Sequence, residues 1–463
     1  MIKFREKVAY GFGDMSSSMF WKIIGMYMLY FYTDVVGLAP AAVGTMFLIT
    51  RIWDTANDPI MGIIADRTNT RWGKFRPYLL FGAIPFAVIG VLTFFVPDFS
   101  STGKLVYAYV TYTLLMMVYT FVNVPYASLL GVMSSDPKER NQLSSYRMFF
   151  AYLGSFVALA LVEPLVKVFS NIGGEVSEAR GYVCTVAVIG TMCAILFFLC
   201  FKWTKERVKP LKIKQNSVAK DLKNLIKTAP WWILLVAGIA ALIFNSIRDG
   251  ATIHYFKYYI RQDNAVNLFG GFFTLSALYL TIGQAANMVG VALSATIFNR
   301  IGKKKTYIAA MALAAVLSIV FYSFRPDQLV LIFTFQILIS ICAGSIFPML
   351  WSMYADIADY SELKTGNRAT GLILSSSSMS QKLGWTLGGA VTGWILGYYG
   401  FQANQLQTTE TIHGIRMMLS YLPAIGAILS VVAISFYPLN EKRVREISGD
   451  LEVKRKEKEL SEA

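Results

Sequence analysis

The chain has 463 residues, of which 55% are hydrophobic and 15% are charged, and its mean hydropathy is +0.49. This composition excludes a soluble globular protein, because soluble domains carry about 25% charged residues. The net charge of +15 does not indicate nucleic-acid binding, since the Lys and Arg residues lie mostly in alternate loops between apolar runs. That asymmetry predicts a multi-pass protein of a bacterial-type inner (cell) membrane with both termini cytoplasmic.

Apolar runs recur along the chain with short polar breaks between them. A helix needs about 20 residues to cross the hydrocarbon core of a bilayer, and the runs are long enough. Backbone groups in lipid must be satisfied internally and strand-length alternation is absent, so the runs predict helices. The fold class is therefore an all-α membrane protein with twelve transmembrane helices. The expected spans are 9–33, 40–65, 77–97, 104–132, 144–169, 181–202, 229–257, 266–297, 304–323, 328–357, 369–398 and 412–438.

A long basic break separates the first six spans from the last six. It predicts an N-terminal six-helix bundle (1–202), a basic cytoplasmic linker (203–228), a C-terminal six-helix bundle (229–438) and a charged cytoplasmic tail (439–463). A weak repeat relates the halves, because ADRTNTRWGKFRP after the second span has a counterpart in FNRIGKKKTY after the eighth. Two such halves are the arrangement of major facilitator transporters, with a site between them at the middle of the membrane.

A polar cluster interrupts the second span at RIWDTANDP. Asp54, Asn57 and Asp58 are spaced i, i+3 and i+4, so they share one face of one helical turn. The twelve residues from Asp54 to the cytoplasmic Asp66 correspond to about 18 Å of helix, which places the cluster deep in the membrane. Two carboxylates this close repel one another unless a cation lies between them or one is protonated. With neutral oxygens from Asn57 and from Thr120 in the fourth span, they predict a site for Na⁺, H⁺ or both.

A structural explanation of this cluster is also open. Arg51, one turn before Asp54, could simply neutralise that carboxylate and leave Asp58 to another partner. One arginine does not balance two carboxylates, and a charge near the bilayer centre costs from about 2.5 to more than 10 kcal/mol. We therefore favour the cation site.

The first span carries a polar stripe, in which Asp14, Ser18 and Lys22 follow one another at i+4 spacing. Lipid would not tolerate such a stripe, so it is expected to face a cavity. Asp14 belongs either to that cavity or to a structural ion pair. Lys22 is expected in the cavity, where it could hold a substrate carboxylate, or else it pairs with Asp14.

Other spans add weaker candidates. Asn123 lies one turn after Thr120, and Trp351 adjoins polar residues and could stack on a sugar face. The eleventh span holds a serine run that includes Ser378, which could instead serve close helix packing, followed by Lys382. Lys382 is expected to be a cavity cation or a partner of the carboxylates in the second span.

Charged and titratable residues in the seventh span give less specific signals. Arg248 and Asp249 are adjacent, hence on different faces of a helix, and each is expected to pair elsewhere. His254 near the outer end is expected to be structural rather than a proton relay.

The motifs YGFGD, YFYTDVVGL, RIWDTANDPIMG, TRWGKFRP, YTFVNVPYASL and ADIADYSE occur in this order. Through them, and over nearly its whole length, the chain resembles the glycoside, pentoside and hexuronide cation symporters, the family of melibiose permease. The resemblance implies import of a sugar coupled to Na⁺, Li⁺ or H⁺. It also implies that Lys382 matches a lysine close to the cation site. The family's cation-binding positions fall on Asp54, Asn57, Asp58 and Thr120.

The sugar-binding positions depart from the family pattern. Melibiose permease holds galactoside hydroxyls with two aspartates, which fall here on Ser18 and Asn123. A tryptophan one turn after the second aspartate becomes Ala127, and an arginine of the fifth span is displaced to Arg147. Neutral groups cannot make the charge-assisted hydrogen bonds that those aspartates make, so a galactoside is not expected.

The chain is closer to the xyloside and glucuronide branches of the family. We expect a pentoside, a xyloside or another neutral oligosaccharide; the alternative is a hexuronide (glucuronide) whose carboxylate binds Lys22. The expected sugar-binding residues are Asp14, Ser18, Lys22, Asn123, Arg147, Trp351, Ser378 and Lys382.

Other classes of function fit the sequence less well. A proton-coupled exporter of amphipathic compounds would not need the polar stripe. An enzyme would need a nucleophile, a metal cluster or a cofactor loop, and a sensor would need a signalling domain. We expect no enzyme activity, no cofactor besides the coupling cation, and a protein that works as a monomer with a sugar, a cation and the lipid bilayer as its partners.

Overall fold

The computed structural model describes residues 2–95, 97–134, 137–172, 176–207, 225–261, 274–365 and 370–462. Within these ranges the chain is helical, and the one strand-like pairing is an isolated bridge between Thr70 and Gly73. The elements are α1 Phe4–Tyr30, η1 Phe31–Val35, α2 Pro40–Arg67, α3 Arg76–Thr93, α4 Ser101–Met133, α5 Pro137–Ser170, α6 Glu178–Trp203, α8 Ala229–His254, η2 Tyr255–Ile260, α9 Leu275–Ile301, α10 Lys303–Phe321, α11 Leu329–Thr365, α12 Thr370–Tyr398, α13 Thr409–Leu419, α14 Tyr421–Ser435 and α15 Glu441–Glu462.

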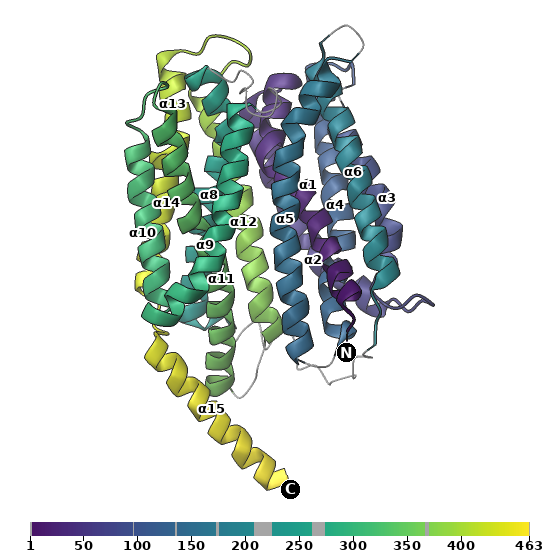
Figure 1. Cartoon of the computed structure of the whole chain (residues 1–463), viewed down its shortest axis with the longest axis vertical. Helices are drawn as coiled ribbons and strands as arrows, with labels where there is room; N and C mark the ends of the chain where they lie inside the picture. Colours follow the sequence, from purple (N-terminus) through teal and green to yellow (C-terminus); the bar gives the residue numbers. More distant parts are fainter. Residues whose placement is uncertain are drawn as a thin grey trace. The chain divides into compact units, whose positions relative to one another are not determined.

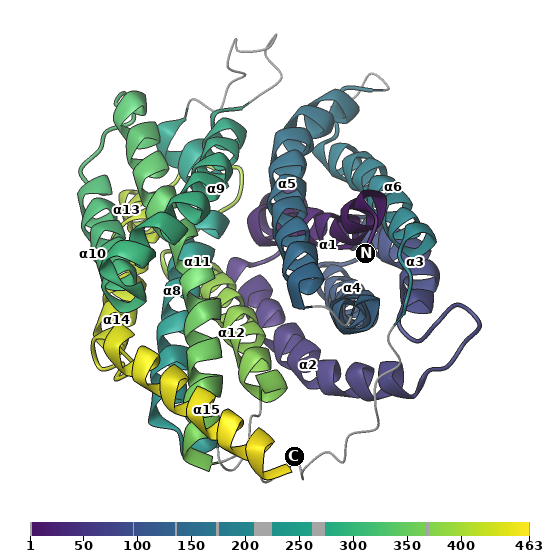
Figure 2. The ribbon, with the colours of Figure 1, turned by 60° about the horizontal axis from the view of Figure 1, so that its bottom comes forward.

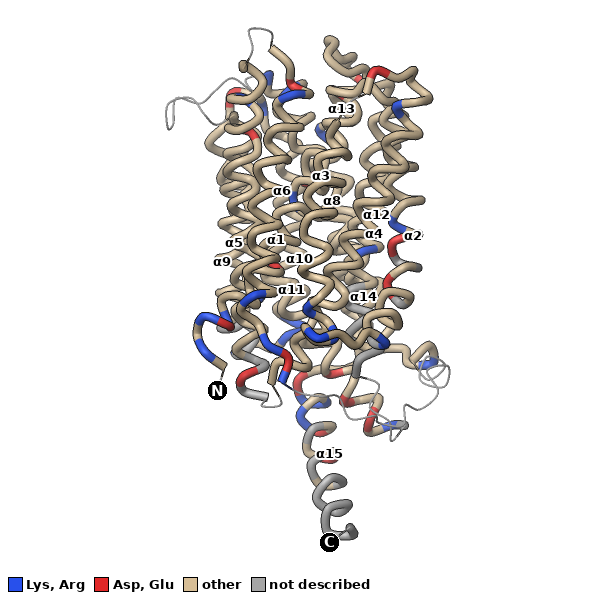
Figure 3. The backbone as a smooth tube through the Cα atoms, turned by 90° about the vertical axis from the view of Figure 1, so that its right-hand side faces the viewer, with Lys and Arg blue, Asp and Glu red and all other residues tan. Residues whose placement is uncertain are grey.

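Helix occupies most of the described residues of each of the twelve expected spans. Among those residues, nine helical stretches are long and apolar enough to cross a membrane. α1, α2 and α12 occupy the other three spans. Figure 3 shows acidic and basic positions within the length of α2, where a helix in contact with lipid would be uncharged.

The last span differs from its prediction. The sequence predicts one helix over 412–438, whereas the structure has α13 and α14 with a break at Ser420. Pro423 lies in the first turn of α14, where its missing N–H does no harm, but in the middle of a continuous helix it would remove a backbone hydrogen bond. The charged tail forms α15.

The helices belong to two compact units. Unit 1 comprises Met1–Lys212, Asp249–Gln284 and Gly389–Ile415, and unit 2 comprises the remaining segments. In unit 1, α1 packs against α5 and α6, and α3 packs against α4 and α6 (Figure 1). The division into bundles at 203–228 stays a prediction, since that segment lies largely outside the described residues.

Close approach of helices in each unit depends on glycine. A Cβ atom on Gly154 of α5 would lie 2.4 Å from the Met15 carbonyl oxygen of α1. In unit 2, a Cβ atom on Gly290 of α9 would lie 2.1 Å from the Ile341 carbonyl oxygen of α11. Neither position has room for a side chain, so these helices touch through their backbones, as membrane helices commonly do.

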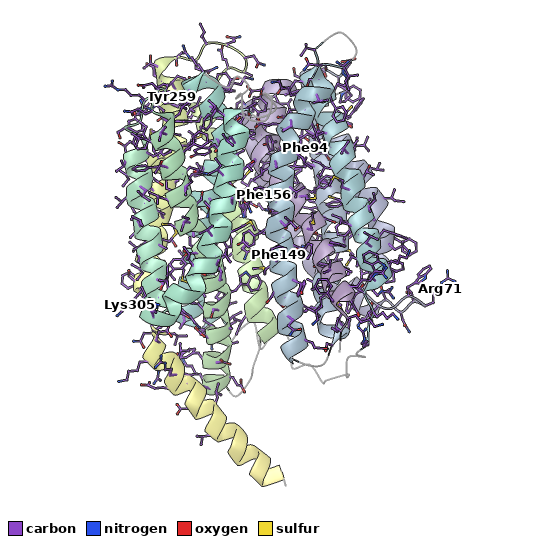
Figure 4. All side chains as sticks on the ribbon, in the orientation of Figure 1. Arg71, Phe94, Phe149, Phe156, Tyr259 and Lys305 are labelled. Carbon is purple, nitrogen blue, oxygen red and sulfur yellow. The ribbon has the colours of Figure 1, made fainter. Side chains whose placement is uncertain are left out.

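The loop between α2 and α3 is tied down by Glu206. Its carboxylate accepts hydrogen bonds from the backbone N–H groups of Lys74, Phe75 and Arg76, at 2.8 to 3.0 Å. A carboxylate at the start of α3 also complements the positive end of the helix dipole. Arg71 extends from the same loop (Figure 4).

The neighbouring residue Arg207 ties the end of this segment to α1. Its guanidinium makes a two-pronged ion pair with Glu6, at 2.6 and 2.7 Å. These hydrogen bonds raise the pKa of Arg207 above its ordinary value. The start of α1 and the segment after α6 are therefore fixed to each other.

Candidate functional site

Two carboxylates of α2 meet one hydroxyl of α4. The Thr120 Oγ1 atom lies 2.7 Å from Oδ1 of Asp54 and 3.1 Å from Oδ1 of Asp58. Asp54 and Thr120 are each 1% exposed, whereas Asp58 is half-buried. The contact arises because α2 packs along α4 (Figure 2). Asn57 is buried on the same turn of α2.

The Thr120 hydroxyl carries a single hydrogen, so it can donate to only one of the two carboxylates at a time. The second contact then brings the lone pairs of a hydroxyl and a carboxylate together. Positive charge between the oxygens, from a cation or from a proton on one carboxylate, removes that conflict. The arrangement therefore suits a bound Na⁺ or H⁺, and Asp54, Asp58 and Thr120 are the groups that would hold it.

Arg51 contacts this cluster loosely. Its Nη1 atom lies 3.9 Å from Oδ2 of Asp54, while its Nε donates to the Tyr112 hydroxyl at 3.0 Å. The guanidinium also lies over the Trp21 ring, 4.1 Å from the centroid. A strong charge-assisted hydrogen bond would be about 2.7–2.9 Å long, so the contact between Nη1 of Arg51 and Oδ2 of Asp54 is longer than such a bond.

The polar stripe of α1 is divided between two ion pairs. Asp14 accepts a hydrogen bond from Nε of Arg147 on α5 at 2.8 Å. Lys22 lies 3.4 Å from Asp249 of α8. The suggestion that Lys22 pairs with Asp14 is therefore wrong, because each residue has a charged neighbour on a different helix. Of the two alternatives for Asp14, a cavity position or an ion pair, the structure shows the ion pair.

A polar and aromatic group lies between this stripe and α4. The Trp21 ring is 5.4 Å from the Tyr119 ring, and the Tyr119 hydroxyl accepts a hydrogen bond from Asn123 at 3.2 Å. The Oδ1 atom of Asn123 is buried and accepts no hydrogen bond within the described part of the chain. Sequence reasoning identified Asn123 and missed Trp21 and Tyr119, although Tyr119 is one turn before Asn123.

The other expected sugar-binding residues are not brought to this place by any described contact. Ser18 is half-buried on α1. Trp351 and Lys382 are half-buried in unit 2, on α11 and α12. The side chain of Ser378 lies outside the described residues. The sugar-binding roles of these four residues stay predictions.

A second buried ionic cluster lies at the end of α1 in unit 1. Asp34 of η1 contacts Lys257 at 3.0 Å and His254 at 3.4 Å, and the Tyr258 hydroxyl donates to it. Asn404, before α13, donates to the Asp34 carbonyl at 2.8 Å. The Asp34 and His254 side chains are 0% exposed. Sequence reasoning did not connect these residues, because they lie more than 200 positions apart.

Comparison with known proteins agrees with this architecture. A family model described as MFS/sugar transport protein matches residues 9–441. The chain is 37% identical to the Escherichia coli (strain K12) protein YagG, provisionally named a glycoside/cation symporter, over 96% of this chain and 94% of that one. It is 35% identical to the isoprimeverose transporter of Lactiplantibacillus pentosus, over 98% of this chain and 92% of that one. It is 34% identical to the glucuronide carrier protein homolog of Escherichia coli (strain K12), over 98% of this chain and 97% of that one.

Among solved structures, that of a D-xylose-proton symporter matches the fold with a TM-score of 0.67 at 13% identity, covering 94% of this chain and 97% of that one. The chain belongs to the MFS/sugar transport protein family. It is a multi-pass membrane transporter of the major facilitator fold, and the resemblance to glycoside and cation symporters is confirmed.

Proposed function

We propose that the protein imports a glycoside, either a pentoside such as a xyloside or another oligosaccharide, by symport with Na⁺ or H⁺. One observation carries the proposal: a single Thr120 hydroxyl lies within hydrogen-bonding distance of two carboxylates in a membrane-spanning helix. A pair of negative groups is costly in that setting unless a cation or proton visits it.

A sugar fits the group formed by Trp21, Tyr119 and Asn123. An aromatic ring can cover an apolar face of a pyranose, and amide and hydroxyl groups pair with its hydroxyls. The buried Oδ1 atom of Asn123 would accept one such hydrogen bond. The names of the relatives, which include an isoprimeverose transporter, support a glycoside as the substrate.

Arg51 supplies a physical connection between the two sites. It lies 3.9 Å from Asp54 on one side and over the Trp21 ring on the other. A cation that binds Asp54 competes with Arg51 for that carboxylate and strengthens the stacking of Arg51 on Trp21. Each ligand then favours the other, by a coupling that is typically about 1–3 kcal/mol.

Alternating access requires the outer ionic cluster to open. Asp34 comes from the first predicted half of the chain, and His254, Lys257 and Tyr258 come from the second. We propose that their contacts hold the outer ends of these segments together in one state of the cycle. They separate in the other state, when water can solvate Asp34.

Hexuronide import is a second candidate, favoured by the position of Lys22 in a membrane-spanning helix and by the similarity to a glucuronide carrier homolog. Its charge would be available to a substrate carboxylate only if its contact with Asp249 gave way.

Uptake into proteoliposomes tests the proposed function. The probes are radiolabelled methyl β-D-xyloside, methyl β-D-glucoside and methyl β-D-glucuronide, each offered with an inward Na⁺ gradient, an inward H⁺ gradient or no gradient. We expect accumulation of at least one probe above equilibrium under one gradient only. Asp54→Asn should abolish accumulation, whereas Asp327→Asn, at an exposed loop position, should not. Equal uptake under all three conditions contradicts symport.

A further inference from the structure

Lys22 of α1 and Asp249 of α8 form an ion pair inside segments that cross the membrane. Their Nζ and Oδ2 atoms are 3.4 Å apart, and the two side chains are 14% and 21% exposed. Both residues belong to unit 1, and Asp249 lies within the apolar stretch Ala229–Ile260. The sequence predicts only that Asp249 pairs with a residue other than its neighbour Arg248.

The geometry of this pair differs from that of a structural ion pair. A pair that serves only to hold two helices is expected to be short and shielded, because burial of charges is repaid only by close contact and further hydrogen bonds. Asp14 and Arg147, at 2.8 Å, meet the distance criterion. Lys22 and Asp249 are farther apart, at 3.4 Å, whereas the exposure of the two pairs is similar (14% and 21% against 29% and 13%), so the longer distance is what distinguishes Lys22 and Asp249.

The residue next to Asp249 does not share its environment. Arg248 donates to the Leu419 carbonyl and to Oε1 of Gln336, the latter at 2.9 Å. The Arg248 guanidinium makes these hydrogen bonds to residues of unit 2. Arg248 therefore contacts unit 2, while Lys22 and Asp249 contact each other.

We propose that Asp249 is a specificity-determining residue that restricts the sugar site to neutral glycosides. This inference rests on the proposed function and deepens it. With a neutral sugar, the Asp249 carboxylate accepts a hydrogen bond from one hydroxyl and the Lys22 ammonium donates to another. With a hexuronide, the substrate carboxylate meets Asp249 as well as Lys22, and the repulsion between the two carboxylates cancels the attraction to the ammonium.

The charge of Asp249 can be removed without changing its shape. Asp249→Asn keeps a hydrogen-bond acceptor for a neutral sugar and removes the carboxylate that would repel an anion beside Lys22. The double variant Lys22→Gln/Asp249→Asn keeps the net charge of the pair at zero. Asp327→Asn serves as the matched control for loss of a carboxylate elsewhere.

The matched probes are methyl β-D-glucoside and methyl β-D-glucuronide, which differ by a hydroxymethyl group against a carboxylate. Their affinities are measured by equilibrium binding to purified protein and by competition with uptake in proteoliposomes. The wild-type protein and Asp327→Asn should bind the glucoside in preference to the glucuronide. In Asp249→Asn the ratio of glucuronide to glucoside affinity should rise by at least about tenfold, and in the double variant it should return to the wild-type value.

Three results would overturn the inference: a wild-type preference for the glucuronide, an unchanged ratio in Asp249→Asn, or a double variant that binds the glucuronide as Asp249→Asn does. If Asp249→Asn does not fold, as judged by size-exclusion chromatography, the inference is tested instead by the glucuronide and glucoside affinities of the double variant and of Lys22→Gln. Lys22→Gln removes the ammonium and keeps the Asp249 carboxylate, so it should weaken glucuronide binding further, and stronger binding would overturn the inference. Failure of the proposed function is distinct, because it appears as loss of gradient-driven uptake of every probe by the wild-type protein.

Discussion

Neutralising Asp58 should weaken cation binding by a factor that follows from the geometry around Thr120. Because Thr120 Oγ1 lies 2.7 Å from Asp54 Oδ1 and 3.1 Å from Asp58 Oδ1, these carboxylate oxygens are at most 5.8 Å apart. Two negative charges at that distance repel by about 3 kcal/mol at an effective dielectric constant of about 20. A proton on either carboxylate removes this repulsion, and Na⁺ between the two gains an attraction to Asp58 of at least this size; Asp58→Asn loses both effects.

The expected loss of about 3 kcal/mol corresponds to an increase of about 100-fold in the dissociation constant for the coupling cation. The assay is isothermal titration of the purified protein with NaCl at constant ionic strength, together with the Na⁺ and pH dependence of sugar uptake. Asp327→Asn is the control. The reasoning is refuted if Asp58→Asn binds Na⁺ and H⁺ with wild-type affinity, or if its sugar uptake keeps the wild-type cation dependence.

Three further predictions concern stability. Gly154→Ala should lower the melting temperature in detergent, because the new Cβ atom meets the Met15 carbonyl oxygen at an overpacking cost of about 1–3 kcal/mol. The control Gly131→Ala places its Cβ atom with nothing within 4 Å and should leave the melting temperature unchanged. Equal melting temperatures for the two variants would contradict the tight contact at Gly154. Asp34→Asn should destabilise the protein by up to about 3–5 kcal/mol, because Lys257 loses the buried carboxylate that it contacts at 3.0 Å; an unchanged melting temperature would contradict this contribution. Glu206→Ala should remove the acceptor of three backbone N–H groups and raise hydrogen exchange of the α2–α3 loop, at a cost of about 1–2 kcal/mol; unchanged exchange would contradict this role.

The helices and the grouping of carboxylates on α2 were predictable from the sequence because both depend on local geometry. Apolar runs of membrane length can satisfy their backbone only as helices, wherever the helices pack. Asp54, Asn57 and Asp58 share a face of one turn whatever surrounds them, since the spacing of a helix fixes it. The break at Ser420 was not predictable from Pro423 alone, since Pro125 lies inside the continuous helix α4.

The partners of charges on different helices could be known only from the tertiary structure. The stripe of α1 places Asp14 and Lys22 on one face, yet one pairs with Arg147 of α5 and the other with Asp249 of α8. Which residues meet across two helices depends on the crossing angle and depth of packing, and nothing in either helix alone encodes these. The sequence by itself determined that charges lie within membrane-spanning segments and that two carboxylates share one turn of α2. Only the packing of the helices decided which charges are already paired.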